Sequence, residues 1–252
     1  MKAAIEKGDA KELAELMRQD PGFEVNKVQR NGRTLLHYAC WGSTSFPVIP
    51  LLLAHPDIDV NVKSNDGGTP FNLACIMGST RCVREMLKDS RVKVNEPDKY
   101  DGTPLWWAAS NGHLDVIRWL VASGREMDLG ELGERKTDAI GRAKEKGKSE
   151  VVALLERFKE NPVEIRHALR VEYRLLDELA AEMFALVVFV SDGLLQIKDT
   201  ATPSPAARYL NIARRLPLEL QMMLCHRVMG STKEIIQGKE NEVAFKELAR
   251  RL

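Results

Sequence analysis

Short apolar blocks alternate with polar, glycine-containing segments through residues 1–160. The spacing of the apolar positions predicts pairs of short helices, each pair joined by a turn that contains a glycine. Small residues at the centre of each first helix let neighbouring helices approach closely, and each second helix carries two large apolar residues. The small pairs are Ala39-Cys40, Ala74-Cys75 and Ala108-Ala109, the turn glycines are Gly42, Gly78 and Gly112, and the apolar pairs include Leu51-Leu52, Met86-Leu87 and Leu154-Leu155.

The helix pairs recur with a nearly constant period. Thr34, Thr69 and Thr103 lie 35 and 34 residues apart, and Thr137 follows after another 34 in a weaker copy. Apolar residues recur fourteen positions after each threonine, so the extra residue of the first interval falls in the loop that holds His55. An insertion that leaves the apolar positions in register is typical of true structural repeats. Two further series keep this spacing: Val25-Asn26, Val60-Asn61 and Val94-Asn95; and Val48, Val83, Ile117 and Val151.

Thr69-Pro70 and Thr103-Pro104 are typical of an N-cap followed by proline at the first helical position. Together with the segment GHLDV that begins at Gly112, these motifs resemble the ankyrin repeat. The resemblance implies an all-α fold, a solenoid of helix pairs with short hairpin fingers, over residues 1–160. The expected units are a cap at 1–27, repeats at about 28–63, 64–97 and 98–131, and a degenerate repeat at about 132–160. His37 matches the histidine of the family motif, whereas Asn72 and Trp106 replace it in the next two repeats.

The period ends near residue 161, and residues 161–252 are expected to form a carboxyl-terminal α-helical domain, either compact by itself or an extension that docks on the last repeat. Residues 163–190 are predicted to form one long helix, apolar on nearly every side in its second half and therefore buried. Further helices are predicted at 204–216, 217–230 and 240–252. This part of the chain resembles the helical tails of uncharacterised ankyrin proteins.

The formal net charge of +1 gives no reason to expect binding to nucleic acid or to a membrane surface. The amino terminus lacks the apolar core of a signal peptide, and no apolar run is long enough to cross a bilayer. Four cysteines show neither a C-x-x-C pair nor zinc-ligand spacing, and Cys40 and Cys75 are expected to be small core residues. We therefore expect a monomer in the cytoplasm or the nucleus, with free thiols.

No catalytic arrangement is predicted, and neither a cofactor nor a metal is expected. Gly147-Lys148-Ser149 resembles the end of a phosphate-binding loop, but Arg142 stands where that loop needs a glycine and no strand precedes it. The five histidines have no nucleophile or metal ligand at a useful spacing.

The ankyrin resemblance implies that finger tips and the outer turn of each first helix contact a partner. Large apolar residues at Trp41, Ile76 and Met77 are expected to form an interaction patch, unless they pack within the chain, for instance under the helical tail. Carried over repeat by repeat, the predicted partner-binding residues are Arg30, Asn31, Arg33, Trp41, Asn65, Asp66, Ile76, Met77, Lys99, Tyr100, Trp106, Ser110 and Asn111.

The family resemblance also implies a candidate modification at Asn61. Asparaginyl hydroxylases of ankyrin repeats favour an upstream leucine and an acid before the valine-asparagine pair, and Leu53 with Asp59 completes this pattern only for Asn61. The alternative is a hairpin asparagine that hydrogen-bonds its own loop.

The sequence therefore favours a non-enzymatic scaffold or adaptor that binds another protein through the concave ankyrin surface. A second hypothesis makes the carboxyl-terminal helical domain the active element, as an assembly or oligomerisation module. An enzyme in that domain is a third and weaker alternative.

Overall fold

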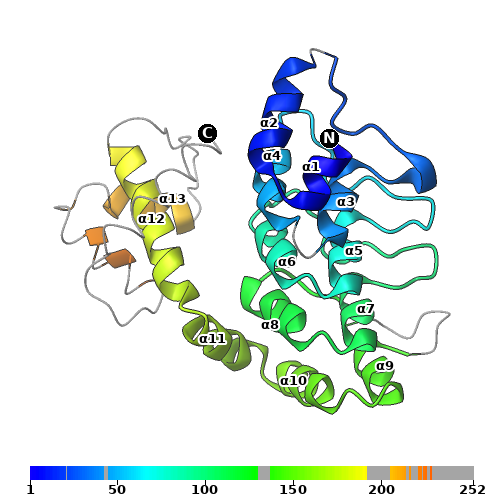
Figure 1. Cartoon of the computed structure of the whole chain (residues 1–252). Helices are drawn as coiled ribbons and strands as arrows, with labels where there is room; N and C mark the ends of the chain where they lie inside the picture. Colours follow the sequence, from blue (N-terminus) through cyan, green and yellow to red (C-terminus); the bar gives the residue numbers. More distant parts are fainter. Residues whose placement is uncertain are drawn as a thin grey trace. The chain divides into compact units, whose positions relative to one another are not determined.

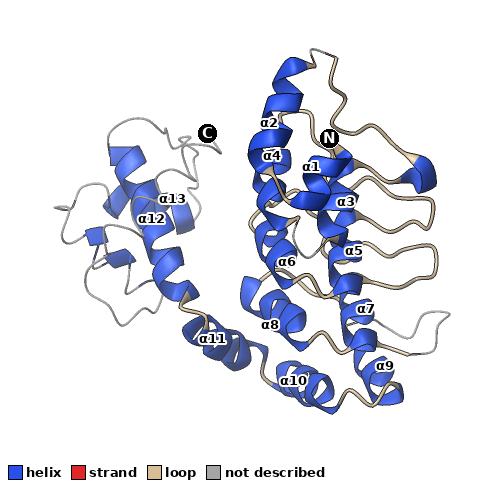
Figure 2. Ribbon diagram, viewed as in Figure 1, coloured by secondary structure: helices blue, strands red, loops and turns tan. Residues whose placement is uncertain are grey.

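The computed structural model describes residues 1–20, 22–42, 45–129, 137–191 and 205–213, with Leu216, Gln221, Met222, Leu224, Cys225 and Val228. Within these ranges the regular elements are helices and no strand occurs (Figure 2), which confirms the all-α class. The chain divides into two compact units, Met1–His167 and Ala168–Leu252. None of the helices in the described ranges is long and apolar enough to span a membrane.

The first unit is a stack of helix pairs, as expected for a solenoid (Figure 1). Each inner helix packs against the inner helix of the next pair, and the outer helices from α4 onward do the same. The inner helices are α1 (Lys2–Lys7), α3 (Leu35–Trp41), α5 (Pro70–Met77), α7 (Pro104–Asn111) and α9 (Ala139–Glu145). The outer helices are α2 (Ala10–Gln19), α4 (Ile49–Leu53), α6 (Thr80–Leu87), α8 (Leu114–Ser123) and α10 (Ser149–Glu160), and the short 3-10 turns are η1 (Arg30–Gly32) and η2 (Phe46–Val48).

Threonine and proline start the inner helices as the sequence predicts. The Thr69 hydroxyl accepts a hydrogen bond from the backbone N–H of Asn72 at 3.1 Å, and Pro70 occupies the first helical position. In the fourth copy, however, the N-cap is Asp138, which accepts from the N–H of Gly141 at 2.6 Å. The alignment of Thr137 with the preceding threonines is therefore wrong by one residue, because a carboxylate one position later performs the capping.

The fingers approach each other closely enough to require glycine. We number the fingers in chain order, so that the first carries Asn31, the second Asp66 and the third Lys99. The N–H of Lys99 donates to the carbonyl of Asp66 at 3.0 Å, which joins the third finger to the second. A Cβ on Gly67 would lie 2.7 Å from the Lys99 nitrogen, and one on Gly32 would lie 2.6 Å from the nitrogen of Asn65. Both glycines also have positive φ, so a side chain at either position would be strained as well as crowded.

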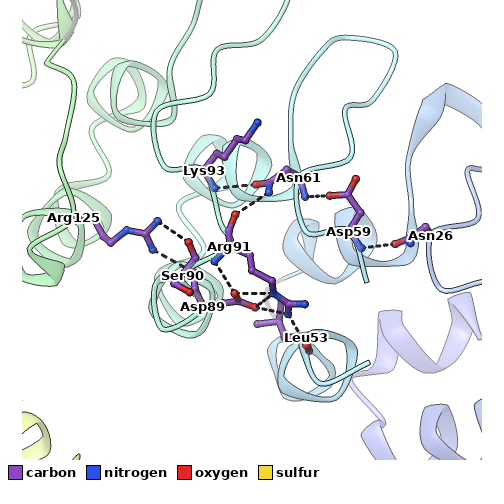
Figure 3. A network of polar contacts seen from close by, with 9 residues as sticks. All are labelled: Asn26, Leu53, Asp59, Asn61, Asp89, Ser90, Arg91, Lys93 and Arg125. Carbon is purple, nitrogen blue, oxygen red and sulfur yellow. Dashed lines mark hydrogen bonds and ion pairs between the residues drawn. The ribbon is translucent and has the colours of Figure 1, made fainter. Parts of the chain in front are cut away.

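Asparagines of the valine-asparagine pairs hold each repeat to the next (Figure 3). The Nδ2 of Asn61 donates to the carbonyl of Arg91 at 2.9 Å, and its Oδ1 accepts from the N–H of Lys93 at 2.9 Å. Asn26 and Asn95 make the same two bonds to the backbone of the repeat that follows them. Each asparagine amide thus donates to one backbone carbonyl and accepts from one backbone N–H of the next repeat, as a neighbouring peptide group would.

Two arginines reach back in the opposite direction. Arg91 donates to the carbonyl of Leu53 at 2.8 Å, near the end of the preceding outer helix (Figure 3). Arg125, 34 residues later, donates to the carbonyls of Asp89 at 3.2 Å and Val92 at 2.6 Å. Arg91 thus places a cation at the carboxyl end of α4, where the helix dipole favours a positive charge.

Cys40 and Cys75 are fully buried, which confirms that they are small core residues. The Cys40 thiol donates to the Met86 sulfur at 3.3 Å, and the Cys82 thiol donates to the carbonyl of Ala39 at 3.7 Å. These contacts join α3 to α6, so the thiols belong to the packing between repeats.

The single long helix predicted at 163–190 is wrong. The chain instead forms α11 (Pro162–Glu172) and α12 (Leu175–Ser191), separated by Arg174 with φ of 56°. A left-handed residue ends a helix, and the N–H of Arg174 donates to Val171 three residues back. Neither glycine nor proline marks this position in the sequence, which is why the break was not predicted. The boundary between the two units, at His167, falls within α11.

The second unit has its own apolar core, in which α12 packs with α13 (Pro205–Ala213). Phe184 and Val187 of α12 are buried, and the Tyr209 hydroxyl lies 3.4 Å from the sulfur of Cys225. The helix predicted at 204–216 is confirmed over Pro205–Ala213. The helix predicted at 217–230 lies largely outside the described residues, and that at 240–252 lies wholly outside them.

Candidate functional site

One face of the inner helices carries large apolar residues in rows. Residues with the same offset from the helix cap lie next to one another, because the inner helices stack in register. Four positions after the cap the row is Tyr38, Leu73, Trp107 and Arg142, and seven positions after it the row is Trp41, Ile76, Ser110 and Glu145. We define the inner face as Tyr38, Trp41, Leu73, Ile76, Met77 and Trp107. The row at offset seven becomes polar at Ser110 of α7, and the row at offset four becomes polar at Arg142 of α9, so the apolar surface ends across these two helices.

Two residues of the inner face are well exposed. Trp41 ends α3 and is 45% exposed, and Met77 ends α5 and is 43% exposed. Ile76, which has the same offset from its cap as Trp41, is half-buried. Large apolar groups that are exposed at these positions gain little from packing within the solenoid, and large exposed apolar patches mark interaction sites.

Cations lie over the aromatic rings at the first end of this face. The guanidinium of Arg33 is 4.2 Å from the centroid of the Trp41 ring, and the ammonium of Lys2 is 4.4 Å from that of Tyr38. Tyr38 and Trp41 are three residues apart on α3 and so lie on one side of it. This end therefore combines apolar surface with two positive charges.

At the other end of the inner face, Trp107 is hydrogen-bonded to a carboxylate. Trp107 donates its indole N–H to Asp98 Oδ2 at 2.9 Å. The other oxygen of Asp98 accepts from the N–H groups of Tyr100 and Gly102, both at 2.9 Å. Asp98 thus shapes the third finger and fixes the edge of the Trp107 ring.

The predicted finger residues lie at the surface. Arg33 is half-buried, and the other members are exposed. Backbone bonds hold the tips together, since the carbonyl of Asn31 accepts from the N–H of Asn65 at 2.9 Å. The exposed members are Arg30, Asn31, Asn65, Asp66, Lys99 and Tyr100.

Two of the predicted partner-binding residues are not at the surface, and this part of the prediction is corrected. Trp106 is only 7% exposed, because its side chain turns toward the next repeat and donates its indole N–H to the carbonyl of Thr137 at 3.2 Å. Ser110 is 6% exposed and accepts from the guanidinium of Arg142 at 3.2 Å. Asn111 is exposed, but its amide donates to the carbonyl of Ile76 at 2.9 Å.

Trp106 performs the role of the motif histidine that it replaces. Nε2 of His37 donates to the carbonyl of Gly68 at 3.2 Å, and Nδ2 of Asn72 donates to that of Gly102 at 3.1 Å. Three different side chains therefore donate to the same acceptor in each case, the backbone carbonyl of the residue that precedes the N-cap of the next inner helix. Burial is the main reason that the pKa of His37 is lowered from 6.5 to about 4, so its imidazole is neutral at physiological pH.

Three residues of the inner face were missed by the sequence reasoning. Tyr38, Leu73 and Trp107 share an offset of four from the helix cap. That constant offset was the available signal, because a helix presents positions four and seven after its cap on one side. The prediction took the finger tips and the start and outer turn of each first helix, and passed over the position four after the cap.

The described residues offer little for catalysis. No group of three or more acidic, histidine or cysteine side chains among them could hold a metal. Burial raises the pKa of the Cys82 thiol to about 11 and raises the pKa of Cys40 and of Cys75 as well, so none is a reactive thiolate. Gly147 and Lys148 lie in the turn between α9 and α10, Ser149 begins α10, and the Lys148 side chain lies against Gly112.

Comparison with known proteins matches the first unit. A family model for ankyrin repeats in many copies matches residues 1–53, and one for three copies matches residues 44–131. The human SMC5-SMC6 complex localization factor protein 1 is 41% identical over 103 residues, which are 40% of this chain and 10% of that protein.

Two other relatives match over a similar length. Alpha-latrocrustotoxin-Lt1a of Latrodectus tredecimguttatus is 33% identical over 99 residues, covering 39% of this chain and 7% of the toxin. Human Rabankyrin-5 is 30% identical over 101 residues, covering 40% of this chain and 9% of that protein. The chain thus spans a tenth or less of these much longer relatives.

Proposed function

Because this chain belongs to the ankyrin-repeat proteins, whose repeats bind other proteins, we propose that it is a non-enzymatic adaptor that holds a partner on its inner face. The observation that carries the proposal is the exposure of Trp41 and Met77 at the ends of adjacent inner helices. Buried aromatic anchors dominate the energetics of protein interfaces. A relative named as a localization factor for a complex is consistent with an adaptor role.

The remaining parts of the proposal rest on sequence. The near-neutral net charge supports a partner that is a protein rather than nucleic acid. The four free cysteines, which are all buried, support a reducing compartment, cytoplasm or nucleus. We propose that the chain acts as a monomer, with the exposed fingers bordering the bound partner.

The proposal is tested by capture of partners on the immobilised chain, comparing the natural sequence with a Trp41→Ser, Met77→Ser variant. The thermal midpoint is expected to stay within about 2 °C, because surface substitutions change stability by about 0.5 kcal/mol or less. The captured amount is expected to fall about tenfold or more, the loss of one interface anchor.

The matched control replaces exposed apolar residues away from the inner face. Val163 and Val171 of α11 are 74% and 53% exposed, and changing both to serine removes a comparable apolar surface. Capture is expected to be unchanged in this control. A large drop in thermal midpoint for the Trp41 and Met77 variant, or equal capture by all forms, would contradict the proposal.

A second candidate function makes the carboxyl-terminal unit an assembly module. Ile212 and Val228 of this unit are 63% and 52% exposed, although the unit has a core of its own. Measuring the mass of the whole chain in solution over a wide concentration range distinguishes the two candidates. A dimer that dissociates when Ile212 is changed to serine supports assembly, and a constant monomer mass contradicts it.

A further inference from the structure

We infer that the segment bound on the inner face is acidic at one end, with carboxylates held by Arg33 next to an apolar side chain that packs on Trp41. This inference rests on the proposed function and adds the chemistry and the direction of the partner. It is carried by the geometry of Arg33 and by the distribution of charge over the fingers.

Arg33 is already positioned to bind a carboxylate. Its guanidinium lies 4.2 Å from the Trp41 ring centroid, and none of the described residues forms an ion pair with it or accepts a hydrogen bond from its side chain. A guanidinium held over an aromatic ring still has N–H groups to donate, and its fork geometry fits a carboxylate with two parallel bonds. Because the ring restrains the arginine, less conformational entropy is lost on binding.

The finger that carries Arg33 is positive. The first finger contains Lys27, Arg30 and Arg33, and no acid occurs between the first and the last of these. Lys2 lies over the neighbouring Tyr38, and the ion pair that it makes with Glu6 is long at 3.9 Å. Glu24 precedes the finger in the sequence. A cluster of like charges attracts acidic segments and repels basic ones.

The far end of the inner face has the opposite character. The third finger carries Asp98 and Asp101 around a single cation, Lys99, and Trp107 is bonded to Asp98. An acidic stretch placed here would meet carboxylates. The charges of the two fingers therefore fix the direction of the segment, with its acidic end at the first finger and its apolar part running toward Met77.

The experiment is selection of random displayed peptides on the intact chain, followed by fluorescence anisotropy with the enriched peptides made synthetically. Enriched sequences are expected to contain glutamate or aspartate beside large apolar residues. Arg33→Gln should weaken their binding about tenfold, the scale of a charge-assisted pair, and Arg33→Lys should recover only part of it. Lys99→Gln removes the same charge from the third finger and should change binding less than about twofold. Added salt should weaken binding to the natural sequence more than to Arg33→Gln.

The variants separate failure of this inference from failure of the proposed function. If enriched peptides lose binding with Trp41→Ser and Met77→Ser but not with Arg33→Gln, the inner face binds and the acidic specificity is wrong. If neither variant changes binding, both proposals are wrong. Enrichment of basic or neutral peptides, the absence of any enrichment, or binding that appears only when phosphoserine replaces the glutamates, also overturns the inference.

Discussion

Asn72 donates its side-chain amide to the carbonyl of Gly102 at 3.1 Å, while its own Oδ1 is buried without a hydrogen-bond partner among the described residues. Both ring nitrogens of the equivalent His37 are hydrogen-bonded, because its Nδ1 accepts from the N–H of Thr34 at 3.1 Å and its Nε2 donates to Gly68. An unbonded buried carbonyl oxygen costs about 1–3 kcal/mol relative to a bonded one.

Replacing Asn72 by histidine is therefore expected to stabilise the protein. The imidazole would donate to Gly102 and accept from the N–H of Thr69, so that no polar atom remains unbonded. We expect the free energy of unfolding to rise by about 1 kcal/mol and the thermal midpoint by about 2–4 °C, measured by calorimetry. The reciprocal His37→Asn should lower both by a similar amount. A midpoint that falls in Asn72→His would show that the site is too narrow for imidazole.

Acid is expected to destabilise the first unit through His37. The pKa of this histidine is 6.5 when exposed and about 4 when folded, so the unfolded chain binds more protons between these values. Stability is therefore complete above pH 6.5 and decreases as the pH falls to about 4, by up to about 3 kcal/mol. Denaturant unfolding at a series of pH values measures this loss of stability. The difference between the natural sequence and the His37→Asn variant isolates the contribution of His37, because both proteins have the same carboxylates. Parallel curves for the two proteins would exclude His37 as the cause.

Hydroxylation of Asn61 remains a prediction, and Asn95 of the same chain provides an internal control. Asn61 and Asn95 make equivalent bonds to the following repeat, but only Asn61 has an acid two residues before it, Asp59, where Asn95 has Lys93. After exposure to an asparaginyl hydroxylase of ankyrin repeats, mass spectrometry is expected to find oxygen added at Asn61 and not at Asn95. An unmodified Asn61 excludes it as a substrate.

The cysteines are expected to be unreactive in the native protein. Burial raises the pKa of each thiol and also blocks access, and Cys225 lies against the Tyr209 hydroxyl. A thiol reagent at mildly alkaline pH should label none of the four rapidly, and all of them after denaturation. Rapid labelling of one cysteine in the native state, located by peptide mapping, would identify a part of the fold that opens.

The repeats were predictable because their signals are local. Threonine caps, the prolines that follow two of them and the turn glycines each act within a few residues, and in the first three repeats the structure has them where the sequence places them. Trp106 was not predictable in this way. Its side chain is buried and donates to the carbonyl of Thr137. The sequence aligned Thr137 with the caps, whereas the cap is Asp138, so Thr137 was not identified as the acceptor residue that precedes the cap. The helix break at Arg174 was missed for a different reason, since no glycine or proline accompanies its left-handed conformation.

The bonds between repeats have a consequence for how such a chain changes over generations. His37, Asn72 and Trp106 each offer a donor, and the acceptor in the next repeat is always a backbone carbonyl, at Gly68, Gly102 and Thr137. A backbone carbonyl is present whatever residue occupies the position. These particular bonds therefore require no particular residue in the next repeat, and they can form again when a gene segment that encodes a repeat is duplicated, deleted or exchanged. The two exposed residues of the inner face, Trp41 and Met77, make none of these bonds and are therefore free to diverge in each copy.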